Sequence, residues 1–175
     1  MEIKNADYST IVRFGTVEDL CKKIQLNNEQ LKDVIDIKTV NGASLLENAI
    51  SQRKFDIARF LLMNNAKVNV VTNFGYNEFH ILASNIRYEG AVEIGEILLK
   101  KDVSLIQKDN VFGNTAFFTL LLESYKVRTP EVMSFIEKCI VRIKDFDIKN
   151  NAGISIRNLI INNGWDNIKK KLENL

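Results

Sequence analysis

The sequence contains little proline, glycine, histidine or cysteine. Its 175 residues include one proline, eight glycines, one histidine and two cysteines. So few prolines and glycines argue against long linkers, collagen-like segments and a turn-rich β-sandwich. The single histidine, His80, removes most acid–base and metal chemistries that are built on a pair of histidines. These absences disfavour an enzyme, and we expect no catalytic residue and no bound metal.

The two cysteines, Cys21 and Cys139, lie far apart and show no metal-ligand spacing. A disulfide framework is therefore not expected, and the thiols should be reduced. Cys21 falls on the apolar stripe of an expected helix, and Cys139 lies among apolar neighbours. Because nothing near either residue in sequence would lower a thiol pKa, we expect both in the core rather than as nucleophiles.

The sequence also lacks an excess of one charge and any long apolar run. Its 24 basic and 22 acidic residues give a formal net charge of +2. Nucleic-acid binding usually requires a strongly basic face, and this near-neutral charge does not indicate one. No apolar segment approaches the ~20 residues of a membrane span, and residues 1–7 lack the apolar core of a signal peptide. Each glycine is accounted for by a turn, which leaves none for a phosphate-binding loop. We therefore expect a cytoplasmic protein that needs no cofactor and binds neither nucleic acid nor membranes.

What the sequence does contain is a repeated unit. In each copy, a glycine suited to a turn of positive φ is followed two residues later by a residue suited to cap a helix, and then by two apolar helical stretches. The pairs of glycine and cap are Gly42 and Ser44, Gly75 and Asn77, Gly113 and Thr115, and Gly153 and Ser155. The glycines are spaced by 33, 38 and 40 residues, a period typical of a solenoid of helix pairs. Two amphipathic helical stretches, at 8–14 and 17–24, precede the first of these glycines.

The repeated unit resembles the ankyrin repeat, whose pattern is Gly-x-Thr-Pro-Leu-His-x-Ala, a second helix and then Leu-Leu-x-x-Gly-Ala-x-Val-Asn. The matching stretches read Gly-Ala-Ser-Leu-Leu-Glu-Asn-Ala at 42–49 and Leu-Leu-Met-Asn-Asn-Ala-Lys-Val-Asn at 61–69. The unit recurs at 75–82 and 113–120. The proline of the pattern is missing in every copy, and its histidine survives only as His80, whose expected role is to tie adjacent turns by hydrogen bonds. The resemblance implies an all-α solenoid of stacked helix pairs with short hairpin-like connections.

The whole chain, 1–175, is expected to form a single domain of about five repeats. The expected repeats are 5–36, 37–69, 70–105, 106–146 and 147–175, with the first and last acting as caps. The segment between the two helices is four residues longer in the third and fourth repeats than in the second. Four residues are about one helical turn, so an extra turn or a larger loop is expected around 86–89 and 125–128. Stacking would place the two insertions side by side.

The resemblance implies that the chain binds a protein partner through its hairpin tips and the concave face of its inner helices. Large aromatic residues near the turn glycines and on the two insertions would form a strip across the third and fourth repeats, and clustered exposed aromatics are typical of binding surfaces. For Phe74 and Phe112 the alternative of packing against the next hairpin stays open. The expected binding residues are Asn41, Asn73, Phe74, Tyr76, Tyr88, Phe112, Asn114 and Tyr125.

Several functions remain open at this point. The favoured one is a non-catalytic, monomeric protein-interaction module that acts by rigid surface complementarity. A second is an inhibitor or immunity-type protein that masks the active site of a toxin or effector. An enzyme would need an unexpected pocket with converging acids. A nucleic-acid binder would need the basic residues to gather on one face, which the near-neutral charge disfavours.

Overall fold

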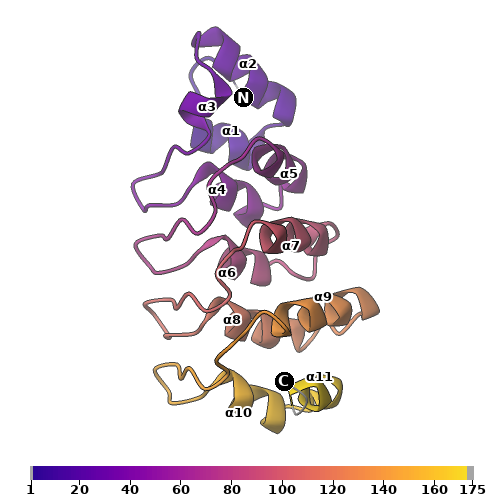
Figure 1. The fold of residues 1–175 in the computed structure, drawn as a ribbon. Coiled ribbons are helices and arrows are strands. Elements are labelled where there is room, and N and C mark those ends of the chain that lie inside the picture. The colour runs from indigo at the N-terminus through magenta and orange to yellow at the C-terminus, as the bar shows by residue number, and fades with distance from the viewer. Residues whose placement is uncertain (1, 173–175) are drawn as a thin grey trace.

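The computed structural model of the chain describes residues 2–172, which are helical apart from turns and loops. The described helices stack in pairs along one long axis, with the N-terminus at one end and the C-terminus at the other (Figure 1). Their bounds are α1 Tyr8–Phe14, α2 Val17–Leu26, α3 Leu31–Val34, α4 Leu45–Ser51, α5 Phe55–Met63, α6 Glu78–Ala83, α7 Ala91–Lys100, α8 Ala116–Ser124, α9 Pro130–Ile140, α10 Ile156–Asn162 and α11 Asp166–Leu172.

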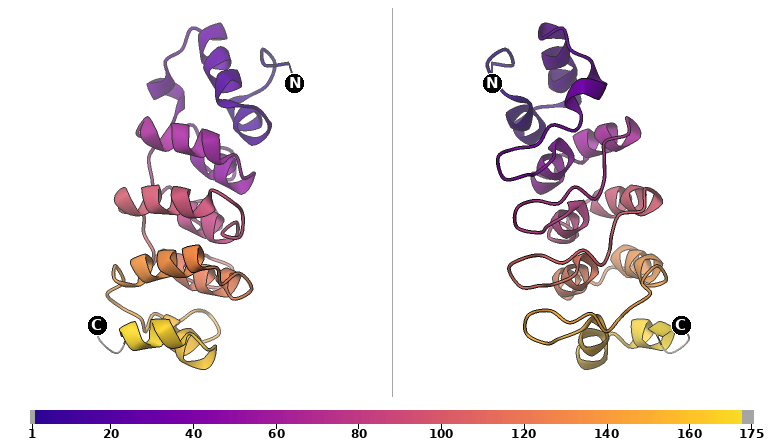
Figure 2. Two further views of the ribbon diagram at one scale, coloured as in Figure 1. Left: turned by 90° about the vertical axis from the view of Figure 1, so that its right-hand side faces the viewer. Right: turned by 60° about the vertical axis from the view of Figure 1, so that its left-hand side comes forward.

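The helices form two layers. Helices α4, α6, α8 and α10 make one column, and helices α5, α7, α9 and α11 make the other (Figure 2). Four hairpin-like loops project on the side of the first column (Figure 1). We call them the second, third, fourth and fifth tips, at residues 39–43, 72–76, 109–114 and 150–154. Within the described residues, β-structure is limited to isolated bridges at the bases of the second, fourth and fifth tips.

Local sequence explains where the helices of the first column begin. Ser44, Asn77, Thr115 and Ser155 have extended backbones, and the side chain of each accepts a hydrogen bond from the N–H three residues later. Each side chain thereby satisfies one of the free N–H groups of a first helical turn. The four expected caps are thus confirmed. The four turn glycines, at positions 42, 75, 113 and 153, have the expected positive φ.

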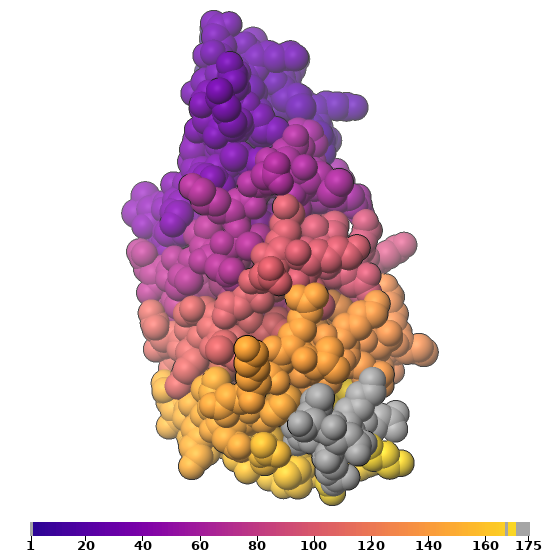
Figure 3. All heavy atoms as spheres, viewed as in Figure 1, coloured from indigo at the N-terminus to yellow at the C-terminus, as the bar shows by residue number. Residues whose placement is uncertain are grey.

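The core runs through the whole stack without interruption between repeats. Its largest fully buried side chains include Trp165, Phe79, Phe117 and Phe135. The rings of Phe79 and Phe135 stack with their centroids 6.0 Å apart, which joins α6 to α9. Successive repeats are therefore held together by apolar packing, and they form one continuous surface on the face that Figure 3 shows.

Of the following three local features, only the expected burial of Cys21 needs correction. The segment that follows α2 contains the short helix α3, Leu31–Val34. The insertion of the third repeat adds a loop of turns from Ser84 to Gly90, whereas in the fourth repeat α8 has nine residues against seven in α4. Cys21 is only half-buried, because it lies at the edge of the buried face of α2, while Cys139 is in the core as expected.

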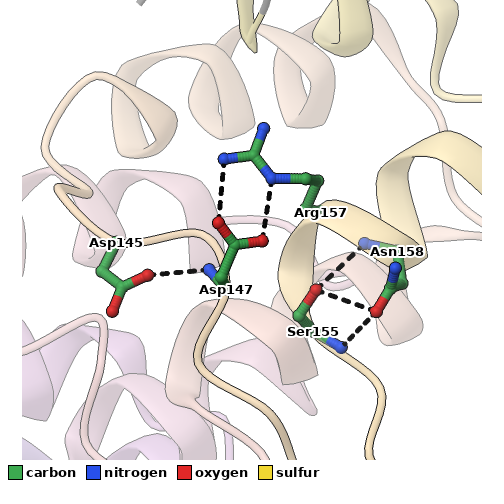
Figure 4. A network of polar contacts seen from close by, with 5 residues as sticks. All are labelled: Asp145, Asp147, Ser155, Arg157 and Asn158. Atoms are coloured by element: carbon green, nitrogen blue, oxygen red, sulfur yellow. Dashed lines mark hydrogen bonds and ion pairs between the residues drawn. The ribbon is translucent and has the colours of Figure 1, made fainter.

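The fifth repeat is closed by polar contacts around the start of α10. Arg157 donates two hydrogen bonds to the carboxylate of Asp147, at 2.8 and 3.1 Å (Figure 4). The N–H of Asp147 in turn donates to Asp145 at 2.8 Å. Beside them, Ser155 and Asn158 form a capping box, in which each side chain receives the backbone N–H of the other (Figure 4). The ion pair is exposed, so the capping box contributes more to holding this helix start than the pair does.

Candidate protein-binding surface

The tips are tied to one another by a ladder of asparagines. The backbone N–H of Asn73 donates to the carbonyl of Asn41 at 3.0 Å, and that of Asn151 donates to Phe112 at 2.9 Å. Asn110 donates in the same way to the third tip, at 2.8 Å. The side-chain amides of these three asparagines also donate to the preceding tip. Asn73 is exposed as expected, yet its side chain holds a neighbouring tip, while Asn41 is exposed and offers its side chain to solvent.

The fourth tip is one residue longer than the others. In the second, third and fifth tips the closing backbone hydrogen bond joins residues four apart, and in the fourth it joins Asp109 to Asn114, five apart. The buried carboxylate of Asp109 satisfies the enlarged turn, because it accepts the N–H groups of Val111, Phe112 and Asn114 at 2.8, 2.6 and 3.0 Å. The side chains at the end of this tip project, and Phe112 is 62% exposed.

A groove of about 490 Å³ lies between the fourth and fifth tips and the helices α8 and α10. Six of its lining residues are apolar, three are asparagines and one is alanine, and none is charged. Phe118 and Leu159 form its buried floor, while Val111, Phe112, Leu122 and Ile154 are between 42% and 62% exposed. Its lining residues are Val111, Phe112, Asn114, Phe118, Leu122, Asn150, Asn151, Ala152, Ile154 and Leu159.

The expectation that Asn114 is exposed at a tip is wrong, because the side chain is 91% buried in the wall of this groove. Asn114 lies at the base of the hairpin, where its backbone carbonyl accepts the closing hydrogen bond of the tip from Asp109. Its backbone carbonyl accepts from His80 Nε2 at 3.3 Å. Its side-chain oxygen accepts from Nδ2 of Asn150 at 2.8 Å.

His80 connects the third repeat to this groove. Its Nδ1 accepts the backbone N–H of the capping residue Asn77 at 3.2 Å, and its Nε2 faces the carbonyl of Asn114. Burial lowers the pKa of the imidazole, which favours the neutral ring. The Nε2 contact ties His80 to the following repeat, while the Nδ1 contact is with the cap of its own helix. The aromatic ring of Tyr76 packs edge-on against the imidazole, with the centroids 5.4 Å apart, so Tyr76 is half-buried.

Phe74 is exposed at its tip, as expected. Its side chain is 53% exposed at the end of the third tip. It lies outside the lining of the groove. The aromatic ring pairs among the described residues do not include Phe74 with Phe112. The two phenylalanines are therefore separate exposed groups rather than parts of one stacked strip.

Tyr88 and Tyr125 are engaged by arginines rather than left free on the insertions. The guanidinium of Arg53, from the second repeat, lies 4.6 Å from the ring centroid of Tyr88, and that of Arg87 lies 5.0 Å from it. Such cation–π contacts stabilise by about 0.5–1 kcal/mol at exposed sites. Tyr88 is consequently half-buried and links its insertion to the repeat before it.

The guanidinium of Arg128 joins the insertion of the fourth repeat to the fifth repeat. It lies 4.7 Å from the ring centroid of Tyr125 and 4.1 Å from that of Trp165. It also donates to the carbonyls of Asn163 and Gly164, at 3.0 and 2.8 Å. Tyr125 remains 53% exposed, so one face of its ring is open to solvent.

The two insertions lie side by side as expected. A small hollow of about 230 Å³ is lined by residues of both, namely Ser84, Ile86, Arg87, Leu122, Glu123, Lys126 and Val127. Leu122 reaches both this hollow and the groove. The insertions therefore border the candidate surface, although their tyrosines do not line the groove.

The expected binding residues include neither Leu122 nor the groove residues of the fifth repeat. Two signals point to them. The segment from the first residue of the tip to its glycine is one residue longer in the fourth tip than in the other three tips. The stretch from Ala116 to Leu122 is also apolar at nearly every position, more than one buried face needs. The excess apolar residue on this helix is Leu122, which is 45% exposed.

Two buried carboxyl groups lie outside the groove, on the adjacent helices α4 and α6. Glu78 accepts the N–H groups of Asn69 and Val70 at 2.9 and 3.0 Å. Glu47 accepts the N–H of Ser44 at 2.7 Å with one oxygen, and its other oxygen has no partner among the described residues. Burial raises the pKa of each carboxyl to about 7, and the nearby charge of Glu78 adds to the rise at Glu47. Both carboxyls accept hydrogen bonds from backbone N–H groups, which is typical of a structural role.

The thiol of Cys139 lies in the apolar core. Burial raises the pKa of the Cys139 thiol well above its usual range, which suppresses the reactive thiolate. Among residues 2–172, no three histidine, cysteine or acidic side chains are grouped so that they could hold a metal ion. None of the described helices has the length and apolar character needed to cross a bilayer.

Comparison with protein-family models finds no match. Comparison with curated proteins finds no significant match either. The assignment of a function therefore depends on the geometry of the chain.

Proposed function

We propose that this chain is a non-catalytic protein-interaction module of the ankyrin-repeat type, and that it binds its partner on the concave face, at the groove between the fourth and fifth tips. The groove carries this proposal. It gathers four partly exposed apolar residues, Val111, Phe112, Leu122 and Ile154, on a wall that has no charged side chain. Contiguous exposed apolar surface of this kind is typical of protein-binding sites.

The rigidity of the wall favours the same function. The fourth and fifth tips are joined by the backbone hydrogen bond from Asn151 to Phe112, and the buried Asp109 fixes the enlarged fourth tip. A preformed surface loses little conformational entropy when it binds. The placement of His80 between turns and the suppressed reactivity of Cys139 support binding rather than catalysis.

The ankyrin-type assignment is supported by the repeated combination of tip glycine, capped inner helix and outer helix. The His80 bridge to the following repeat has the role that the resemblance implies for the histidine of the pattern. Asn65 and Asn69 adopt positive φ in the stretch that matches Gly-Ala-x-Val-Asn, where asparagine is among the few residues that tolerate this conformation.

Site-specific photo-crosslinking tests the proposed function. A photoreactive amino acid replaces Ala152, an exposed residue of the groove, in the chain expressed in cells of its source. The control places the same group at Asp56, which is exposed on α5 in the opposite layer. We expect one or a few proteins to be crosslinked from position 152 and not from position 56. Equal labelling from both positions, or none from position 152, would contradict the proposal.

A further inference from the structure

The width of the groove limits what can enter it. Helices α8 and α10 pack directly against each other. Packed helices have axes about 8–10 Å apart, whereas a helix with its side chains is about 10–12 Å wide. The Asn151–Phe112 hydrogen bond of 2.9 Å closes the gap at the tips. Individual side chains can enter between the two repeats, but a helix cannot.

The lining limits the charge of the entering group. Because none of the ten lining residues is charged, an inserted carboxylate or ammonium group would lose its water without gaining an opposite charge. The apolar walls contributed by Phe112, Leu122 and Ile154 and the apolar floor instead favour a large neutral side chain, which gains by leaving water.

The wall also contains one hydrogen-bond donor that is not used within the chain. Asn150 accepts the N–H groups of Ala152 and Ile154 with its Oδ1, so its Nδ2 must face Asn114. Asn114 therefore presents Oδ1 to Asn150, and its own Nδ2 has no hydrogen-bond partner among the described residues. This Nδ2 is not fully buried, so it can donate a hydrogen bond to an acceptor that enters the groove.

We propose that the groove receives an extended, uncharged peptide segment of the partner protein, which inserts one large aliphatic or aromatic side chain between Phe112 and Ile154 and accepts a hydrogen bond from Asn114 Nδ2 with a main-chain carbonyl. This inference rests on the proposed function and names the chemistry of the partner. An extended segment suits the donor, because each of its residues carries a main-chain carbonyl that no helix has already engaged.

Selection from a displayed library of random peptides tests this inference. The bait is the full chain, and each enriched peptide is then measured against the Leu122→Glu variant. The matched control is Ile106→Glu, because Leu122 and Ile106 are 45% and 48% exposed and only Leu122 lines the groove. We expect enriched peptides that share a neutral stretch with one large apolar residue. They should bind the Leu122→Glu variant roughly tenfold or more weakly and the Ile106→Glu variant unchanged.

The donor is tested with the best selected peptide. In a ¹H–¹⁵N correlation spectrum of the unaltered protein, the side-chain amide signal of Asn114 should shift downfield on binding. Asn114→Asp keeps an oxygen toward Asn150 and removes the donor, so it should weaken binding roughly tenfold, and melting curves check that this variant is folded. An unmoved Asn114 signal would overturn the assigned donor.

The outcomes separate this inference from the proposed function. Selected peptides with a charged consensus, or binding that Leu122→Glu does not alter, would overturn the extended neutral segment. So would the absence of any enriched peptide. The photo-crosslinking result at position 152 would stand in each of these cases. A concentration-dependent dimer that Leu122→Glu abolishes would also overturn the inference, because the occupant would then be a second copy of the chain.

Discussion

Gly113 lies directly beneath the side chain of Asn151, so that a Cβ atom on the glycine would be 2.3 Å from the asparagine oxygen. The glycine also has φ of +67°, where L side chains are strained. The two residues belong to successive tips, and their contact lets Asn151 reach the carbonyl groups of Val111 and Phe112. Glycine is therefore required here both by its own turn and by the next repeat.

The first prediction concerns this contact. Gly113→Ala should lower the free energy of unfolding by about 2–3 kcal/mol, the sum of backbone strain and the hydrogen bonds lost when Asn151 moves. The matched control is Gly153→Ala, because Gly153 has φ of +75° but no atom within 4 Å of the added carbon. The control should lose only about 1 kcal/mol. Urea denaturation measures both, and equal losses would contradict the interpretation of the ladder.

The second prediction concerns Arg128. Arg128→Lys removes the planar group that stacks on Trp165 and donates to two carbonyl groups, so it should lower the free energy of unfolding by about 1–2 kcal/mol. Hydrogen exchange should rise selectively in α10 and α11. Arg87→Lys is the control, since the hydrogen bond and the cation–π contact of Arg87 are with Tyr88 of its own insertion. If both variants behave alike, Arg128 does not anchor the fifth repeat.

The third prediction concerns pH. Glu47 and Glu78 have pKa values of about 7 in the folded chain, raised by burial from the usual 4.5. Between about pH 4.5 and 7 the folded state therefore binds more protons than the unfolded state, so stability falls as the pH rises. The positive charge of Lys38 opposes the rise at both carboxyls without cancelling it. We expect the free energy of unfolding to decrease by about 2–4 kcal/mol from about pH 5 to about pH 8.

Glu47→Gln identifies the groups responsible for this dependence. The glutamine keeps an oxygen for the N–H of Ser44 and cannot ionise, so the decrease between about pH 5 and about pH 8 should become roughly half as large. Glu89→Gln is the control, because Glu89 is exposed on an insertion. Denaturation curves at several pH values provide the measurement. An unchanged pH dependence in Glu47→Gln would show that this carboxyl is ionised throughout.

The sequence predicts the local features of the fold well and the contacts between repeats poorly. Caps such as Ser44 and turn glycines depend on a few neighbouring residues, and both follow from the residue types alone. The position of Tyr88 depends on Arg53 of another repeat, which no local pattern indicates. The contacts that hold Asn114 come from His80 and Asn150 of the neighbouring repeats, which no pattern within one repeat indicates.

The groove was predictable in part. The sequence indicates Phe112, because a large aromatic beside a turn glycine is unusual at a solvated tip. It does not indicate that Leu122 and Ile154 line the same groove, because they come together only when α10 packs on α8. The exposed area of an apolar side chain depends on the neighbours that cover it. For Leu122, those neighbours come from the repeats before and after its own.

The fourth prediction separates the expected aromatic residues into binding and structural groups. Phe112→Ser should lower the free energy of unfolding by less than about 0.5 kcal/mol, since the side chain is 62% exposed, and it should weaken capture of the partner. Tyr76→Ser should cost about 1–2 kcal/mol, because its ring covers His80. Phe74→Ser, exposed on the adjacent tip, is the matched control for binding and should leave capture nearly unchanged. Capture by the photo-crosslinking variant at position 152, combined with denaturation of each variant, measures both effects. If Phe74→Ser weakens capture as much as Phe112→Ser does, the binding surface extends over the third tip, and the groove alone does not define it.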